Sequence, residues 1–134
     1  MTLIDSNVLV DIFTTSSDWF EWSMEHLDRQ SSTGPLYFDE IVYAELAVKS
    51  QGEAQLDLAL ADLGLQLHPI PKSALFLAGK TFAQYRKAGG SRTSSLPDFF
   101  IGAHAQVANL PLLTRDVGRY RTYFPKVKLI APEK

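Results

Sequence analysis

The sequence has no cysteine among its 134 residues. This absence excludes disulfide bonds, thiolate metal sites and cysteine nucleophiles. The chain also lacks any apolar run near the ~18 residues that a membrane-spanning helix needs. Residues 1–5 (MTLID) do not place a basic segment before a long apolar stretch, so they do not form a signal peptide. We therefore expect no membrane segment and a cytoplasmic location.

Basic residues are scarce in the first half of the chain, and acidic residues are scarce in the second. Residues 1–67 contain 12 Asp or Glu and 2 Lys or Arg, whereas residues 68–134 contain 3 acidic and 11 basic residues. Two of those three acids are Asp98 and Asp116. A basic half attracts phosphate groups, while carboxylates hold a cation. Acidic helices and basic loops that merely solvate the surface explain the charge pattern equally well.

Short apolar runs alternate with helical patterns along the chain. The composition, 46% hydrophobic and 21% charged, is that of a globular protein, and the length suits one domain over residues 1–134. Helices are predicted over residues 8–13, 16–30, 40–49, 53–63, 73–86 and 96–109, and strands over 2–4, 36–38, 65–68, 112–114 and 127–130. About five short strands between helices indicate an α/β fold, with helices on both faces of a mainly parallel sheet.

Three carboxylates stand where a predicted strand or helix meets a turn. Asp5 follows the first strand and Asp116 follows the fourth, so both belong at the carboxyl edge of the sheet. Binding sites of open α/β folds form at that edge. Asp98 falls in the first turn of its helix, where the backbone dipole favours a negative charge.

A fourth carboxylate, Glu45, lies in the middle of a predicted helix. It shares a helical face with Ile41 and Val48, so we expect it to point toward the sheet. Burying an unpaired charge is costly, so this carboxylate needs a partner. A metal, a metal-bound water, or a base such as Lys49 or Arg115 would serve.

Each of the four acids alone has a structural explanation, as a helix cap, a first-turn acid, a turn residue or a salt-bridge partner. Their joint placement favours a function, because Asn7 and Thr114 lie beside two of them. Carboxylates that converge at one sheet edge suit a hard divalent cation, and such a site indicates phosphodiester chemistry.

The segments that hold these acids resemble the successive motifs of PIN-domain ribonucleases, and most nearly those of VapC-type toxins from bacterial toxin–antitoxin pairs. The segments are residues 3–8 (LIDSNV), 43–46 (YAEL), 96–103 (LPDFFIGA) and 111–116 (PLLTRD). The resemblance covers essentially the full chain. Ser6 stands where threonine is common, and Asp39 stands where the family often has Ser or Thr as a helix cap. Neither departure removes an acid.

The resemblance implies a PIN-like three-layer α/β/α domain and a metal-dependent endoribonuclease that acts as a toxin. Asp5, Glu45, Asp98 and Asp116 would form the pocket for Mg²⁺ or Mn²⁺, with Asp5 and Asp98 as direct ligands and the other two binding directly or through water. Asn7 and Thr114 would orient the carboxylates by hydrogen bonds. Hydrolysis of RNA by a metal-activated water would leave a 5′-phosphate and a 3′-hydroxyl.

The resemblance also implies protein partners. A VapB-like antitoxin would cover and inhibit the active site, clasped by the helices over residues 40–63, and the toxin would form a homodimer. Basic side chains near the acids would contact the RNA, some of them beside aromatic rings that suit single strands. Solvated loops and core packing are the competing interpretations. The candidates are Arg86, Lys87, Arg92, Arg115 and Arg119.

Two other functions compete with this one. A phosphatase of the haloacid-dehalogenase type would use Asp5 as a nucleophile, but it needs a second acid two residues later, where this chain has Asn7. A non-catalytic PIN module would bind RNA or a protein partner. Such modules typically lose one or more of the acids, and this chain keeps all four.

Overall fold

Five short strands and the helices between them form the framework of the protein in the computed structural model, which describes residues 1–15, 18–90 and 95–132. The strands are β1 (Thr2–Ile4), β2 (Leu36–Phe38), β3 (Leu65–Leu67), β4 (Leu112–Leu113) and β5 (Leu129–Ile130). Among the described residues the helices are α1 (Ser6–Thr14), α2 (Phe20–Ser31), α3 (Glu40–Ala47), α4 (Glu53–Asp62), α5 (Lys72–Lys87), α6 (Leu96–Ala108) and α7 (Gly118–Tyr123).

The strands form one sheet in the order β3-β2-β1-β4-β5, and every neighbouring pair is parallel. The predicted α/β class with a parallel five-stranded sheet is therefore confirmed. The chain builds outward from β1 in one direction through β2 and β3, and then returns to build β4 and β5 on the other side of β1. The strand order reverses between β1 and β4, and ligands bind at such a switch point in open α/β sheets.

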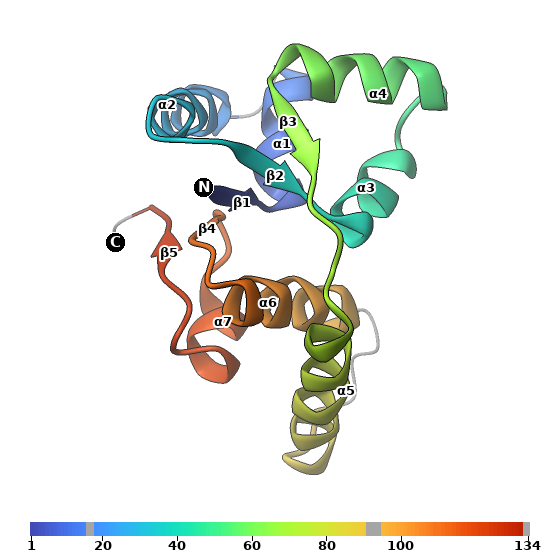
Figure 1. Ribbon diagram of the computed structural model, residues 1–134, viewed down its shortest axis with the longest axis vertical. Helices are drawn as coiled ribbons and strands as arrows, with labels where there is room; N and C mark the ends of the chain where they lie inside the picture. Colours follow the sequence, from blue (N-terminus) through green and yellow to red (C-terminus); the bar gives the residue numbers. More distant parts are fainter. Residues whose placement is uncertain (16–17, 91–94, 133–134) are drawn as a thin grey trace.

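Helices cover both faces of this sheet, giving the predicted three layers. In Figure 1, α2 and α4 lie toward the top of the view, α1 lies behind the strands, and α5, α6 and α7 lie below them. Leu3, Ile4, Leu112 and Leu113 of the two central strands are fully buried. Strands buried on both faces consist of continuous apolar runs, and this is why these short segments are recognisable as strands from sequence.

Helix α7 is the one described element that the sequence interpretation missed. Its six residues follow the turn after Asp116 and bury Tyr120. A helix of that length has too few turns for a recognisable period, so its arginines and tyrosines indicated only a basic and aromatic segment. Elsewhere the predicted bounds differ by a few residues at most, and the predicted start of α2 at residue 16 lies outside the described residues.

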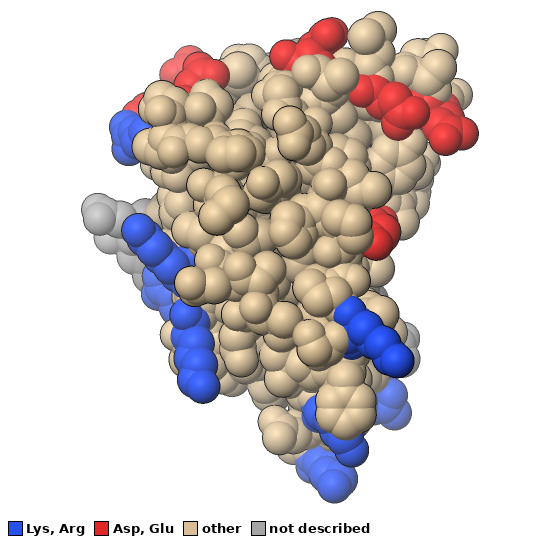
Figure 2. All heavy atoms as spheres, viewed as in Figure 1, with Lys and Arg blue, Asp and Glu red and all other residues tan. Residues whose placement is uncertain are grey.

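Acidic and basic side chains lie at opposite ends of the molecule. Figure 2 shows Asp and Glu gathered over α2 and α4, with Lys and Arg over α5 and beside β5. The sequence halves of opposite charge therefore become two regions of opposite charge in space.

Within the residues described, no helix combines the length and apolarity that crossing a bilayer requires.

Candidate active site at the switch point

Asp5 is the most enclosed of the four acids. It follows β1 directly and caps α1, and its Oδ1 accepts a hydrogen bond from the amide of Ser6 at 2.8 Å. Its Oδ2 accepts from the hydroxyls of Thr114 at 2.8 Å and Tyr120 at 2.9 Å. Burial raises the pKa of Asp5 to about 7, against the lowering effect of these hydrogen bonds, and the charge of Asp98 raises it further. This carboxyl therefore exchanges its proton near neutral pH.

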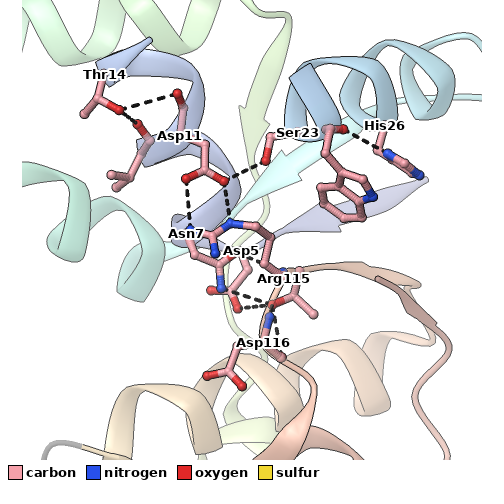
Figure 3. A network of polar contacts seen from close by, with 11 residues as sticks. Asp5, Asn7, Asp11, Thr14, Ser23, His26, Arg115 and Asp116 are labelled. Carbon is pink, nitrogen blue, oxygen red and sulfur yellow. Dashed lines mark hydrogen bonds and ion pairs between the residues drawn. The ribbon is translucent and has the colours of Figure 1, made fainter. Parts of the chain in front are cut away.

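Thr114 connects Asp5 to the turn after β4. The side-chain amide of Asn7 donates to Thr114 Oγ1 at 3.2 Å, and the backbone N–H of Asp116 donates to the same oxygen at 3.1 Å. The backbone N–H of Arg115 donates in turn to Asn7 Oδ1 at 3.2 Å. Figure 3 shows these groups between the start of α1 and the end of β4. Asn7 and Thr114, which were predicted to orient the acids, are thus hydrogen-bonded to each other. Thr114 also bonds Asp5 and the backbone of Asp116, and Asn7 bonds the backbone of Arg115.

Glu45 approaches the same place from α3. Its Oε1 accepts a hydrogen bond from the hydroxyl of Ser6 at 2.9 Å. Burial raises the pKa of Glu45, the Ser6 hydrogen bond lowers it, and the charges of Asp98 and Asp39 raise it. Neither of the bases considered as a partner, Lys49 or Arg115, makes this contact; the protein group bonded to Glu45 is the Ser6 hydroxyl. Val48, expected on the sheet-facing side with Glu45, is 82% exposed, so that side of the helix is not buried as far as Val48.

Asp98 lies in the first turn of α6, where Pro97 occupies one of the first two positions. Arg119 of α7 donates from Nη1 to Asp98 Oδ2 at 2.8 Å. Burial raises the pKa of Asp98, the hydrogen bond and charge of Arg119 lower it, and the charge of Asp116 raises it. Asp98 is therefore both close to a second acid and paired with a base.

Asp116 is the exposed member of the set. Its Oδ1 accepts from the amide of Gly118 at 3.3 Å, at the start of α7. Its carboxylate points away from the Asp11–Arg115 pair in Figure 3. The charge of Asp98 affects the pKa of both Asp5 and Glu45, and the charge of Asp116 affects that of Asp98. Asp98 thus lies within electrostatic reach of each of the other three predicted acids.

The donor chemistry of this site fits a hard divalent cation. The side chains that meet there offer carboxylate, hydroxyl and amide oxygens, the ligands that Mg²⁺ prefers. In the part of the chain described, no three Asp, Glu or His side chains stand close enough together to hold a metal ion. Mg²⁺ usually keeps several waters and needs only one or two carboxylates, so three protein ligands are not required.

The candidate RNA-binding residues that the structure describes lie on three different segments: the turn after β4, the end of α5, and α7. The Arg115 guanidinium makes two hydrogen bonds to buried Asp11 and lies 5.1 Å from the centre of the Trp19 ring. This pair joins the turn after β4 to α1. Arg86 and Lys87 are exposed at the end of α5, and Arg92 lies outside the described residues. Arg119 meets the acids themselves.

Tyr120 is the residue of the site whose role sequence reasoning did not predict. It is 2% exposed, and it reaches Asp5 from an element 115 residues away. A tyrosine in a short segment near an acid signals only a ring that needs burial and a hydroxyl that needs a partner. The sequence contains no signal that this partner is Asp5.

The PIN-domain family model matches residues 2–125, and the chain belongs to the PIN-domain family. Its fold is similar to a chain of the VapBC2 complex from Rickettsia felis bound to a promoter DNA fragment, with a TM-score of 0.71, 20% identity and 98% of each chain covered. It is also similar to VapBC-1 from nontypeable Haemophilus influenzae, with a TM-score of 0.71, 19% identity and 97% of this chain and 96% of that one covered. DNA-bound VapBC from Salmonella typhimurium gives 0.68, 18% identity and 98% of each chain. Among curated proteins, none matches the chain.

Proposed function

We propose that this protein is a metal-dependent endoribonuclease and the toxin of a toxin–antitoxin module. One observation carries the proposal: Asp98 and three further carboxylates within its electrostatic reach lie at the switch point of a PIN-family sheet. Like charges gathered in a partly buried site raise one another's pKa, and a divalent cation relieves that repulsion. Solved structures of similar fold include VapBC complexes, which adds support from relatives.

Asp5 and Asp98 are the side chains that would hold Mg²⁺ or Mn²⁺, with Glu45 and Asp116 at its edge. A bound cation lowers the pKa of a water and offsets negative charge on the phosphate oxygens. The chain's own residues prepare the site. Thr114 and Tyr120 fix Asp5 Oδ2 from two directions. Glu45, whose pKa is raised by burial, is placed by Ser6 to accept a proton from the attacking water.

RNA is the proposed substrate because of the charge around the acids. Asp98 lies in the first turn of α6, which packs against α5, and α5 carries exposed Arg86 and Lys87 at its end. Lys and Arg gather over α5 (Figure 2), so a chain of phosphates bound there would lie next to the helix that carries Asp98. Basic side chains beside aromatic rings suit single-stranded nucleic acid.

The test is cleavage of a mixed cellular RNA pool by the purified protein, with Mg²⁺ or Mn²⁺ and with EDTA. Asp5→Asn and Asp98→Asn should abolish cleavage, because each removes a charge that the cation needs. Asp62→Asn, which changes an exposed acid at the end of α4, is the matched control and should cleave as the wild type does. All three variants should keep the circular dichroism spectrum of the wild type.

Metal-dependent cleavage retained by the Asp5→Asn, Asp98→Asn double variant would exclude this site. Tight RNA binding without cleavage under either metal would instead identify a binding module. The Arg119–Asp98 ion pair is the observation that favours this second function, since it already neutralises one of the acids.

An antitoxin is the proposed protein partner. A largely apolar pocket of about 410 Å³ opens between α1, α3 and α4, and it is lined by Val10, Phe13, Leu46, Leu56 and Ala59, among others. An amphipathic helix of a partner fits such a groove with residues at helical spacing. The α3 and α4 side of this pocket belongs to the region over residues 40–63 where we expect the antitoxin to bind, and Val10 and Phe13 of α1 form its other side.

Phe13→Glu tests this contact, because it places a charge in the pocket without touching the acids. Protein purified from its source cells should carry a second small chain that inhibits it, and the variant should lose that chain and cleave RNA. Leu58→Glu on the exposed side of α4 is the control, since Leu58 is 63% exposed and does not line the pocket. Light scattering of the isolated chain tests the proposed homodimer.

A further inference from the structure

Arg119 forms an ion pair with Asp98, one of the two acids proposed above to hold the cation. The two side chains come from helices α7 and α6, their nitrogen–oxygen distance is 2.8 Å, and they are 25% and 28% exposed. Among the ion pairs of the described residues, this is the one that reaches any of the four acids. Without a metal, the site therefore already contains one positive charge, the Arg119 guanidinium. This charge lies beside the carboxylate of Asp98, the acid that is near the other three.

The guanidinium of Arg119 has a second contact. Its central carbon lies 5.5 Å from the centre of the Tyr85 ring at the end of α5, in the geometry of a cation–π interaction. The Tyr85 ring is fixed in turn by Phe99, 5.3 Å away between ring centres, and by the backbone of Gly90. A side chain at Gly90 is excluded, since its Cβ would lie 2.5 Å from that ring. The Tyr85 ring thus packs against Phe99 and Gly90, so it can support the guanidinium when the ion pair with Asp98 is released.

A carboxylate can serve a divalent cation or a guanidinium, but the two compete for its lone pairs and its charge. The guanidinium of Arg119 occupies one lone-pair direction of Asp98 Oδ2 in the metal-free protein. The stronger field of a doubly charged ion at Asp98 would release the guanidinium.

We propose that Arg119 is an exchangeable cation: it pairs with Asp98 in the metal-free protein, leaves Asp98 when a divalent cation binds there, and then contacts a phosphate oxygen of the RNA from its support on Tyr85. The proposal rests on the proposed function, because it assumes a divalent cation at Asp98. Arg119 would then respond to cation binding. The N–H groups of its planar guanidinium would face a phosphate only after the cation has displaced them from Asp98.

The proposal predicts effects of opposite sign for one substitution. Arg119→Gln removes the competitor for Asp98, so Mn²⁺ should bind about fivefold to tenfold more tightly. The same variant should cleave RNA more slowly at saturating Mn²⁺, because it has lost a phosphate contact. A merely structural arginine would not strengthen metal binding when it is removed.

Arg121→Gln is the matched control. It removes the same charge from the same helix, at an exposed position, and should leave the Mn²⁺ affinity within about twofold of the wild type. The experiment is calorimetric titration of Mn²⁺ into the full-length wild type and both variants at one pH and ionic strength, without RNA. Far-ultraviolet circular dichroism confirms that each protein is folded.

Arg119→Lys is a second variant that keeps the charge but loses the planar fork. It should bind Mn²⁺ with an affinity between those of the wild type and Arg119→Gln. If Arg119→Gln does not fold, the comparison of Arg119→Lys with the wild type still tests the exchange. Equal Mn²⁺ affinity in wild type, Arg119→Gln and Arg119→Lys would overturn the exchange and leave the nuclease proposal standing. Absence of Mn²⁺ binding in all proteins would overturn both. Tighter Mn²⁺ binding with unchanged cleavage would overturn the phosphate contact.

Discussion

The hydroxyl of Tyr120 donates a hydrogen bond of 2.9 Å to Oδ2 of Asp5, joining the last helix of the chain to the end of its first strand. Both groups are almost fully buried. Burial and the charges of Asp5 and Asp98 raise the pKa of Tyr120 well above its usual value, so it remains a donor at any physiological pH. Tyr120 therefore stabilises the ionised form of Asp5.

Tyr120→Phe removes this donor and keeps the ring. The pKa of Asp5 should rise further, because the hydrogen bond lowers it. At pH 7 the variant should cleave RNA about tenfold more slowly, and the acidic limb of its pH–rate profile should move upward by about half a pH unit or more. Tyr123→Phe on the same helix is the control. A pH–rate profile that coincides with that of the wild type would contradict a role for the hydroxyl.

The ionisation of Asp5 should also affect the stability of the metal-free protein. Its pKa rises from a usual value near 3.8 to about 7 in the folded state, mainly through burial. The folded state therefore binds the proton more tightly than the unfolded state does. This contribution to stability is complete below pH ~4 and is lost as the pH rises through about 7. The loss is about 1.4 kcal/mol for each pH unit that separates the folded and unfolded pKa values.

Asp5→Asn removes this titration. In EDTA, the free energy of unfolding of the wild type should fall relative to that of Asp5→Asn between about pH 4.5 and 8, by a few kcal/mol. Urea denaturation at several pH values measures the difference. Asp62→Asn, which changes an exposed acid, should follow the wild type at every pH. Parallel curves for the wild type and Asp5→Asn would show that Asp5 titrates alike in both states.

The Asp11–Arg115 pair should act on stability more than on RNA. Asp11 is 2% exposed and also accepts a hydrogen bond from Ser23 at 2.8 Å. Arg115→Ala leaves this buried carboxylate without its cation, so the free energy of unfolding should fall by about 2–4 kcal/mol. Arg29→Ala, which breaks an exposed pair with Glu25, should cost less than about 0.5 kcal/mol.

A double-mutant cycle with Asp11→Asn separates the pair from other effects. The coupling energy should be about 1–3 kcal/mol, since the two side chains form two hydrogen bonds. An Arg115→Ala variant of unchanged stability but weaker RNA binding would instead restore the role in RNA binding that the sequence suggested.

The sequence predicted the fold well because its central strands, β1 and β4, are fully buried. Continuous apolar runs such as the one in β1 indicate a parallel α/β sheet, and the predicted sheet is confirmed. Asp39 was expected to cap α3, and its Oδ1 does accept from the amide of Val42 at 2.9 Å. Its Oδ2 meets Nδ1 of buried His104, whose Nε2 lies 2.9 Å from Nδ1 of His68. Local geometry determines the cap, whereas the histidine contacts depend on how α6 packs.

The candidate site was likewise predictable where chain order determines it and not predictable where helix packing does. The placement of Asp5 and Asp116 after strands follows from chain order, because parallel strands end at one edge. Which side chains satisfy these acids does not follow from chain order. Ser6 bonding Glu45, and Arg119 bonding Asp98, join elements 39 and 21 residues apart. Such pairings are set by helix packing, which leaves no periodic trace in a single sequence.

Cation binding and the proton on Asp5 should be linked, so removal of the metal should act differently at different pH. A ligand that binds only the folded state stabilises it, by about 2.7 kcal/mol at one hundred times its Kd. Below pH 7 a cation must first displace the proton from Asp5, whose pKa is about 7. Addition of Mg²⁺ should therefore raise the Tm more at about pH 8 than at about pH 6.

Thermal denaturation with Mg²⁺ or with EDTA, at matched ionic strength, measures this difference. In Asp5→Asn the rise in Tm should be small and nearly independent of pH, because that position no longer binds a proton. In Asp62→Asn the rise should match that of the wild type. An equal rise at about pH 6 and pH 8 in the wild type would place the cation away from Asp5, since only binding that competes with its proton depends on pH in this way.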